Sequence, residues 1–183
     1  MRFYIILALF CCSCGGMYVL PNGLEVHRGQ FDIEDVDVAR ALQFVEAEFS
    51  YNYEVQEDFS LYDLIDEEGL SIHFKSINNR SVELKDDGVL GYYEYETHKI
   101  VVYVKHSEIP YYDCLNKYQV LTHELLHFIA HEYLKWDGKP HMYPYMFIKW
   151  AERNGVSKYD TVEVANYVRI VSYCGETYPL DAE

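Results

Sequence analysis

The chain has 183 residues, half of them apolar or aromatic, which excludes a disordered chain and is enough for one domain with a hydrophobic core. Its formal net charge is −15 and its sequence pI is about 4.8. Nucleic-acid binding normally needs a basic patch, and no cluster of Lys and Arg occurs in the chain, so we expect no nucleic-acid partner.

The first 14 residues have the features of a targeting segment. One Arg precedes an apolar run of about eight residues, which is too short to span a bilayer as a helix. The segment resembles a bacterial lipoprotein signal, in which a cysteine after a small residue carries the lipid. We expect Cys14 to be that cysteine because Ser13 precedes it, with Cys12 as the alternative. This resemblance implies an exported lipoprotein anchored to a membrane of the bacterial cell envelope; an ordinary signal peptide or an unprocessed apolar tail is the other interpretation.

We expect residues 15–30 to be a linker and residues 31–183 to form a single domain. Residues 32–49 should be the first helix, because apolar residues recur there at helical spacing and an acidic start suits the helix dipole. The expected core-facing residues are Val38, Ala41, Leu42, Val45 and Phe49. Residues 63–68 are a charged stretch without recognisable chemistry.

Four segments in the middle of the chain have strand patterns. Residues 70–74 alternate as a strand, and residues 82–85 fit another short strand. Residues 88–96 and 99–104 predict a hairpin that turns at Thr97 and His98.

The HExxH motif at residues 123–127 carries the most specific chemistry in the chain. No Gly or Pro lies between residues 111 and 136, and apolar residues recur at core-facing spacing, which predicts a helix. On a helix His123 and His127 are about one turn apart on one face, so both imidazoles can bind one metal ion. Glu124 lies about 100° further round, where its carboxylate can accept a proton from an attacking water. The core-facing residues would be Leu121, Leu125, Phe128 and Ile129.

A catalytic zinc site of this kind needs a third protein ligand and an open position. His131 continues the i, i+4 series, but eight residues of helix place it about 12 Å from His123 along the axis, too far to share an ion. We expect the helix to end near Gly138, which can adopt the left-handed cap conformation. His141 is then the first histidine that can return to the site. Glu152 is the alternative, because other helical zinc sites use a downstream glutamate.

Three segments together resemble the core of the SprT-like, or Spartan-type, zinc peptidases: HELLH at 123–127, WDGKPHMYPYMF at 136–147 and WAERNG at 150–155. That family follows HExxH with a loop, a third His and a helix that opens with an aromatic residue. The resemblance covers roughly residues 88–155. It implies that His123, His127 and His141 bind Zn²⁺ and that Glu124 is the general base.

The chain departs from the family pattern beside the third histidine. The family often has Gly there, whereas this chain has Pro140 and Met142. The DNA-facing parts of the family are not recognisable either, and together with the acidic net charge this argues against DNA-bound substrates.

In zincins the strands before the active-site helix end in an edge strand, which receives an extended peptide by β-augmentation. Residues 91–93 are placed to be that edge. The alternative is an ordinary sheet with aromatic faces.

The C-terminal part predicts two further helices. Residues 145–154 should form one that closes at Gly155, and residues 160–163 resemble a capping box that opens the last helix. That helix would pack through Val164, Tyr167, Val168 and Val171. Cys114 and Cys174 remain for the mature domain, either bridged or reduced.

These features predict an α+β, zincin-like fold with a small mixed sheet, an active-site helix and C-terminal helices. The expected activity is zinc-dependent hydrolysis of peptide or protein substrates, with Tyr143 or Tyr145 as candidates for oxyanion stabilisation. One alternative is a non-catalytic zinc-binding envelope lipoprotein that acts as a binding or exclusion module, and another is a structural domain in which the motif is accidental. Glu124 favours the enzyme, because zinc binding alone does not need that carboxylate.

Overall fold

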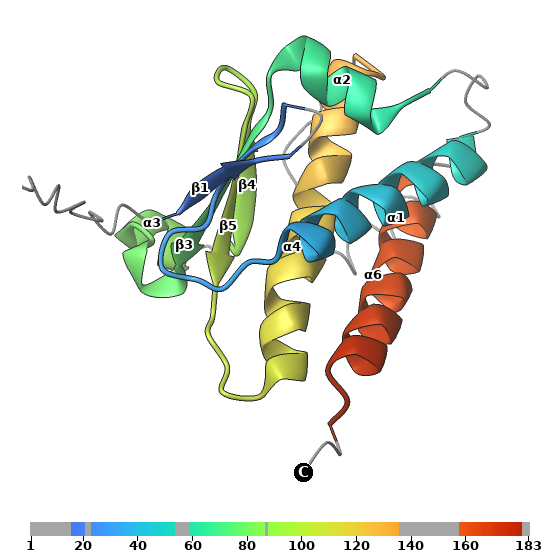
Figure 1. Cartoon of the computed structure of the whole chain (residues 1–183). Helices are drawn as coiled ribbons and strands as arrows, with labels where there is room; N and C mark the ends of the chain where they lie inside the picture. Colours follow the sequence, from blue (N-terminus) through green and yellow to red (C-terminus); the bar gives the residue numbers. More distant parts are fainter. Residues whose placement is uncertain (1–15, 21–22, 54–58, 87, 136–157, 181–183) are drawn as a thin grey trace, which may run out of the picture.

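The computed structural model describes residues 16–20, 23–53, 59–86, 88–135 and 158–180. These residues form a mixed α+β fold with one five-stranded mixed sheet, whose strand order is β1-β2-β3-β5-β4 (Figure 1). Long helices pack beside the sheet, and α4 lies between the sheet and the pair α1 and α6. The predicted α+β class and small mixed sheet are therefore confirmed.

The sheet combines parallel and antiparallel pairs. Its strands are β1 (Met17–Val19), β2 (Glu25–His27), β3 (Ser71–Ser76), β4 (Gly91–Glu94) and β5 (Lys99–Val104). β2 pairs with β3 and β3 with β5 in parallel, whereas β1 pairs with β2 and β4 with β5 antiparallel. The predicted hairpin is confirmed, with its turn at residues 95–98, and β4 forms one edge of the sheet.

The segment over residues 15–30, predicted to be a linker, instead contributes two strands. Val26 is fully buried and pairs with Ile72 of β3, and Leu24 is fully buried beside it. The strands are only three residues long, so the alternation within them is too short to recognise. The parallel partner of β2 is β3, which lies more than 40 residues further along the chain, and this pairing defines β2.

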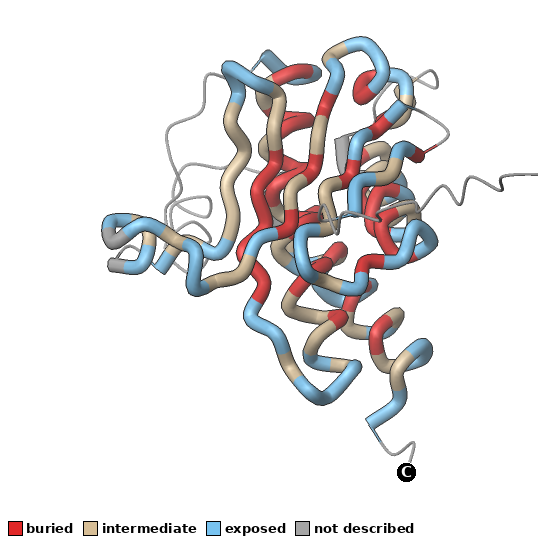
Figure 2. The backbone as a smooth tube through the Cα atoms, turned by 60° about the vertical axis from the view of Figure 1, so that its left-hand side comes forward, coloured by how far each residue is buried: buried red, intermediate tan, exposed pale blue. Residues whose placement is uncertain are grey.

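The helices are α1 (Asp35–Tyr53), α2 (Leu61–Glu68), α3 (Val82–Asp86), α4 (Pro110–Glu132) and α6 (Lys158–Thr177), and a short 3₁₀ turn η1 spans Ile77–Asn79. The five residues predicted to face the core from the first helix are all buried in α1. The four predicted for the motif helix are likewise buried in α4. The buried residues lie along the central strands and on the inner faces of these helices (Figure 2).

Two short segments differ from the prediction because serine caps define them. The charged stretch 63–68 belongs to α2, where Ser60 Oγ accepts the backbone N–H of Asp63 and Gly69 closes the helix in the left-handed conformation. Residues 82–85 form α3 rather than a strand, and Ser81 Oγ accepts the N–H of Leu84. Apolar residues two apart fit either structure when a segment is this short, so the cap decides.

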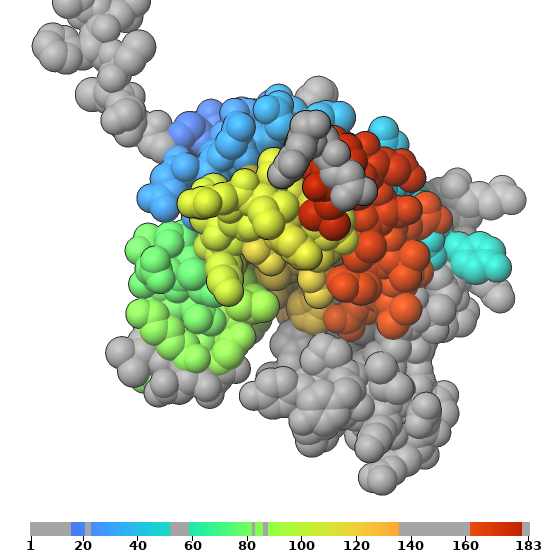
Figure 3. Space-filling view, turned by 90° about the horizontal axis from the view of Figure 1, so that it is seen from below, coloured from blue at the N-terminus to red at the C-terminus, as the bar shows by residue number. Residues whose placement is uncertain are grey.

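The last helix packs through a different face from the one predicted. Val164, Tyr167 and Val168 are exposed on α6. The buried stripe consists of Val162, Asn166, Ile170 and Cys174, at a strict four-residue spacing. α6 also starts at Lys158, before the expected capping box. Seen from below, α6 lies directly against the first turns of α4 (Figure 3).

A disulfide between Cys114 of α4 and Cys174 of α6 fixes this choice of face. The sequence left these cysteines as either bridged or reduced, and in the structure they are bridged. Asp37 of α1 ties the same helices together, because the buried carboxylate accepts the hydroxyl of Tyr118, at 3.0 Å, and that of Tyr173. The helices α1, α4 and α6 are therefore linked to one another near the start of α4, at the end opposite Glu132.

Candidate metal centre

The HExxH motif lies in the second half of α4. Pro110 at the first helical position preorganises the helix start, and the buried face of α4 packs on β4 and β5. His123 and His127 lie on the side of α4 that faces α6, one turn apart as predicted. Their Nε2 atoms are 3.2 Å apart, and their rings are nearly perpendicular, at 76°.

This separation fits two ligands of one zinc ion. Ligand nitrogens about 2.0–2.1 Å from a tetrahedral zinc lie about 3.3 Å from each other. The spacing of the two Nε2 atoms is therefore compatible with a shared metal ion. Imidazole nitrogens are ligands for zinc and for other transition metals, and the two histidines fit such an ion.

Glu163 of α6 contacts the second ring nitrogen of His123, Nδ1. Its Oε1 lies 2.8 Å from Nδ1 of His123, and both side chains are about three-quarters buried. A carboxylate at Nδ1 keeps the proton there and leaves the Nε2 lone pair for a metal, which is the usual arrangement behind a metal-binding histidine. Burial alone would lower the pKa of His123, but the hydrogen bond to Glu163 and the charges of Glu124 and Glu163 raise it.

Sequence reasoning missed this role of Glu163. The pattern at residues 160–163 suggested a capping box, but the Glu163 carboxylate is engaged with His123, 40 positions earlier in the chain. No local spacing marks such a contact. One sequence feature could have indicated the contact: Glu163 is an acidic residue next to the buried Val162, on a helix that packs against the motif helix.

Glu124 is buried, with 3% of its surface exposed. Desolvation raises the pKa of this carboxyl to about 7; the nearby Glu163 also raises it, whereas the charge of His123 and the backbone N–H of Tyr93 oppose the shift. Its Oε2 is buried and accepts no hydrogen bond from any residue that the structure describes. A carboxylate with a spare buried oxygen and a pKa near neutrality has the properties of a general base.

The edge strand β4 passes very close to Glu124. A Cβ atom added to Gly91 would lie 2.8 Å from Glu124 Oε1 and 2.6 Å from Val120 Cγ1, so this position accepts only glycine without movement. Two residues on, the backbone N–H of Tyr93 donates to the Glu124 carboxyl. Gly91 and Tyr93 therefore set the distance between the sheet edge and the motif helix.

Several predicted site residues lie outside the described residues. These are the third-ligand candidates His141 and Glu152, the oxyanion candidates Tyr143 and Tyr145, the lipidation candidates Cys12 and Cys14, and the helix at 145–154 with Gly155. α4 itself ends at Glu132, earlier than predicted. His131 is directed elsewhere, as expected, with Nδ1 2.7 Å from Glu132 Oε1 and its ring stacked on Tyr95. Glu163 is not a third ligand in this arrangement, because it lies at Nδ1 of His123 and not at the paired Nε2 atoms.

Comparison of the chain with models of protein families, with curated proteins and with solved structures finds no match.

Proposed function

We propose that this protein is a zinc-dependent peptidase in which His123 and His127 bind the metal and Glu124 is the general base. The observation that carries the proposal is the pair of Nε2 atoms 3.2 Å apart, with a carboxylate behind one ring and a buried glutamate between the two histidines. A purely structural metal site would not need the third of these features. His141 is the proposed third zinc ligand, with Glu152 as the alternative.

Glu124, Glu163 and Tyr93 have separate tasks in this reaction. Zinc, when bound, polarises the scissile carbonyl and lowers the pKa of water towards neutrality. Glu124 accepts the proton of the attacking water and returns it to the leaving amine. Glu163 keeps His123 in the tautomer that offers Nε2, and the Tyr93 N–H orients the Glu124 carboxyl.

The edge strand β4 supports an extended peptide as the substrate. Tyr103 N–H bonds to Leu90 O, so the alternation of an antiparallel pair turns the backbone groups of Gly91 and Tyr93 away from β5. These groups face the side on which Glu124 lies. A peptide paired with this edge would pass beside the general base.

The resemblance to SprT-like peptidases is part of the same proposal. It rests on residues 123–155, of which the described part contributes the two histidines and Glu124. The net charge of −15 argues for protein or peptide substrates that are not bound to DNA.

We further propose that the enzyme is exported and anchored through lipid on Cys14. The disulfide Cys114–Cys174 supports export, because such bonds persist in oxidising compartments. None of the described helices is both long enough and apolar enough to cross a bilayer. Labelling with a lipid analogue should mark the wild type and fail on Cys14→Ser; unchanged labelling of that variant would move the site to Cys12.

The decisive experiment is peptide cleavage by the wild type and by Glu124→Gln, each with its zinc content measured. The substitution keeps size and hydrogen bonding and removes the base, so zinc should stay while cleavage falls by about 10²–10⁴-fold. His127→Ala should lose zinc and cleavage together. If the zinc-loaded wild type cleaves nothing in a broad peptide library, the non-catalytic binding module becomes the better interpretation.

A further inference from the structure

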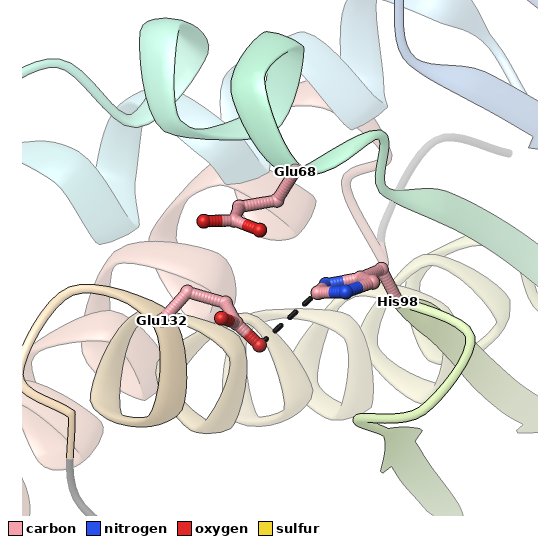
Figure 4. A group of neighbouring side chains, drawn as sticks. All are labelled: Glu68, His98 and Glu132. Atoms are coloured by element: carbon pink, nitrogen blue, oxygen red, sulfur yellow. Dashed lines mark ion pairs between the residues drawn. The ribbon is translucent and has the colours of Figure 1, made fainter.

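A second group of metal-type side chains lies at the far end of α4. Glu68 ends α2, His98 lies in the turn between β4 and β5, and Glu132 ends α4. Each offers one ligand atom, and these three atoms all lie within 4.8 Å of one another. Figure 4 shows the three side chains approaching a common gap from three separate elements.

The geometry is close to that of a bound ion. Two donors about 2.1 Å from one metal are at most about 4.2 Å apart, so small side-chain rotations close the group around an ion. The backbone of His98 has φ at 45°, in the left-handed region that histidine, asparagine and aspartate adopt more often than other residues apart from glycine.

Glu132 is the most buried member of the group, and its neighbours fix its position. It is only 7% exposed, and its Oε1 accepts the Tyr93 hydroxyl at 2.7 Å and faces Nδ1 of His131 at 2.7 Å. Its Oε2 has a weaker contact, with Lys135 Nζ at 4.0 Å, and that lysine side chain is 72% exposed. One oxygen is thus fixed by its neighbours, while the other is not taken by a close partner among the described residues.

Tyr93 orients two members of the group at once. Its hydroxyl donates to Glu132 and lies 3.3 Å from His98 Nδ1. This is the part that an outer hydrogen-bonding residue plays around a metal site. The same tyrosine supplies the N–H that contacts Glu124, so it lies between this group and the HExxH motif.

We propose that Glu68, His98 and Glu132 form a second zinc site, separate from the HExxH centre. One imidazole with two carboxylates suits a transition metal, whereas Mg²⁺ and Ca²⁺ prefer oxygen ligands alone. Glu132 lies five residues after His127, about 7.5 Å further along the helix, so one ion cannot serve both places. The second zinc joins α2, the β4–β5 turn and the end of α4, and it stabilises the folded chain.

The test uses the full chain with His123→Ala and His127→Ala, which removes the first site. Zinc added alone should bind this double variant with about one equivalent by calorimetry and should raise its unfolding temperature. Adding Glu68→Gln, or His98→Asn, should abolish both effects. Asparagine tolerates positive φ, so it removes the ligand and leaves the turn intact. Glu67→Gln, which removes the adjacent charge, is the matched control and should bind as the double variant does.

Three results would overturn the second site. One is a double variant that binds no zinc although circular dichroism shows it folded. Another is unchanged zinc binding after Glu68→Gln. The third is an equal rise in unfolding temperature with the same concentration of Mg²⁺, which would indicate a general charge effect. Because the first site is absent from the double variant, none of these results depends on the proposed peptidase activity.

Discussion

Oε1 of Glu163 lies 2.8 Å from Nδ1 of His123 and so connects the last helix to the HExxH motif. Removing this carboxylate by Glu163→Ala should weaken zinc binding by about 10–100-fold, because the imidazole loses the partner that fixes its tautomer and orientation. The zinc affinity of Glu163→Gln should lie between those of the wild type and Glu163→Ala. The glutamine amide oxygen still accepts the N–H of His123, but it carries no charge. Zinc affinity is measured by competition with a chromophoric chelator.

Glu176→Gln is the matched control for this experiment, since it changes an exposed glutamate of the same helix. It should bind zinc as the wild type does. Wild-type zinc affinity in Glu163→Ala would show that the contact does not support the metal.

The third zinc ligand is tested by comparing His141→Ala with Glu152→Ala. A three-ligand site loses most of its zinc when one ligand is removed, so His141→Ala should be largely metal-free and Glu152→Ala should be zinc-loaded. Metal content per chain is measured on the purified proteins. The opposite pattern would assign the third position to Glu152 and make the site a glutamate-type zincin.

The stability of the metal-free protein should depend on pH through Glu124. Its folded pKa is about 7, above the ordinary value of 4.5, so the folded state keeps a proton that the unfolded state releases between these values. The stabilisation is complete below about pH 4.5 and is lost as the pH rises through 7, a change on the order of 3 kcal/mol.

Glu124→Gln cannot titrate and should lack this component. Urea unfolding of the metal-free proteins from pH 4.5 to 8 gives the wild-type-minus-variant difference, which should fall with rising pH. A flat difference would mean that the carboxyl is not held protonated by its burial.

The contact between β4 and α4 is tested at Gly91. Gly91→Ala places a methyl group 2.6 Å from Val120 Cγ1 and 2.8 Å from Glu124 Oε1, and this overpacking should cost about 1–3 kcal/mol. Cleavage should fall as well, because β4 or the carboxylate has to move. Gly175→Ala in α6 meets nothing nearer than 3.8 Å and should instead stabilise the protein by about 0.5–1 kcal/mol. Wild-type stability of Gly91→Ala would contradict the close contact between β4 and α4.

The sequence by itself determined the elements whose evidence is local. Helical spacing identified the buried face of α1, from Val38 to Phe49, and the buried face of α4 around Leu125. Hydrophobic burial repeats every three to four residues on a helix, so it can be read from one segment. The same regularity placed His123 and His127 on one face and Glu124 beside them, because the geometry of a helix relates residues one turn apart.

Only the tertiary structure decided the relationships between distant segments. Three-residue strands such as β2 depend on pairing with β3, and α6 offers two apolar stripes of which the Cys114–Cys174 disulfide and the packing on α4 select one. The Glu163 contact to His123 spans 40 positions, and the group formed by Glu68, His98 and Glu132 draws on three elements. No spacing along the chain encodes such contacts, because they arise where separate elements pack together.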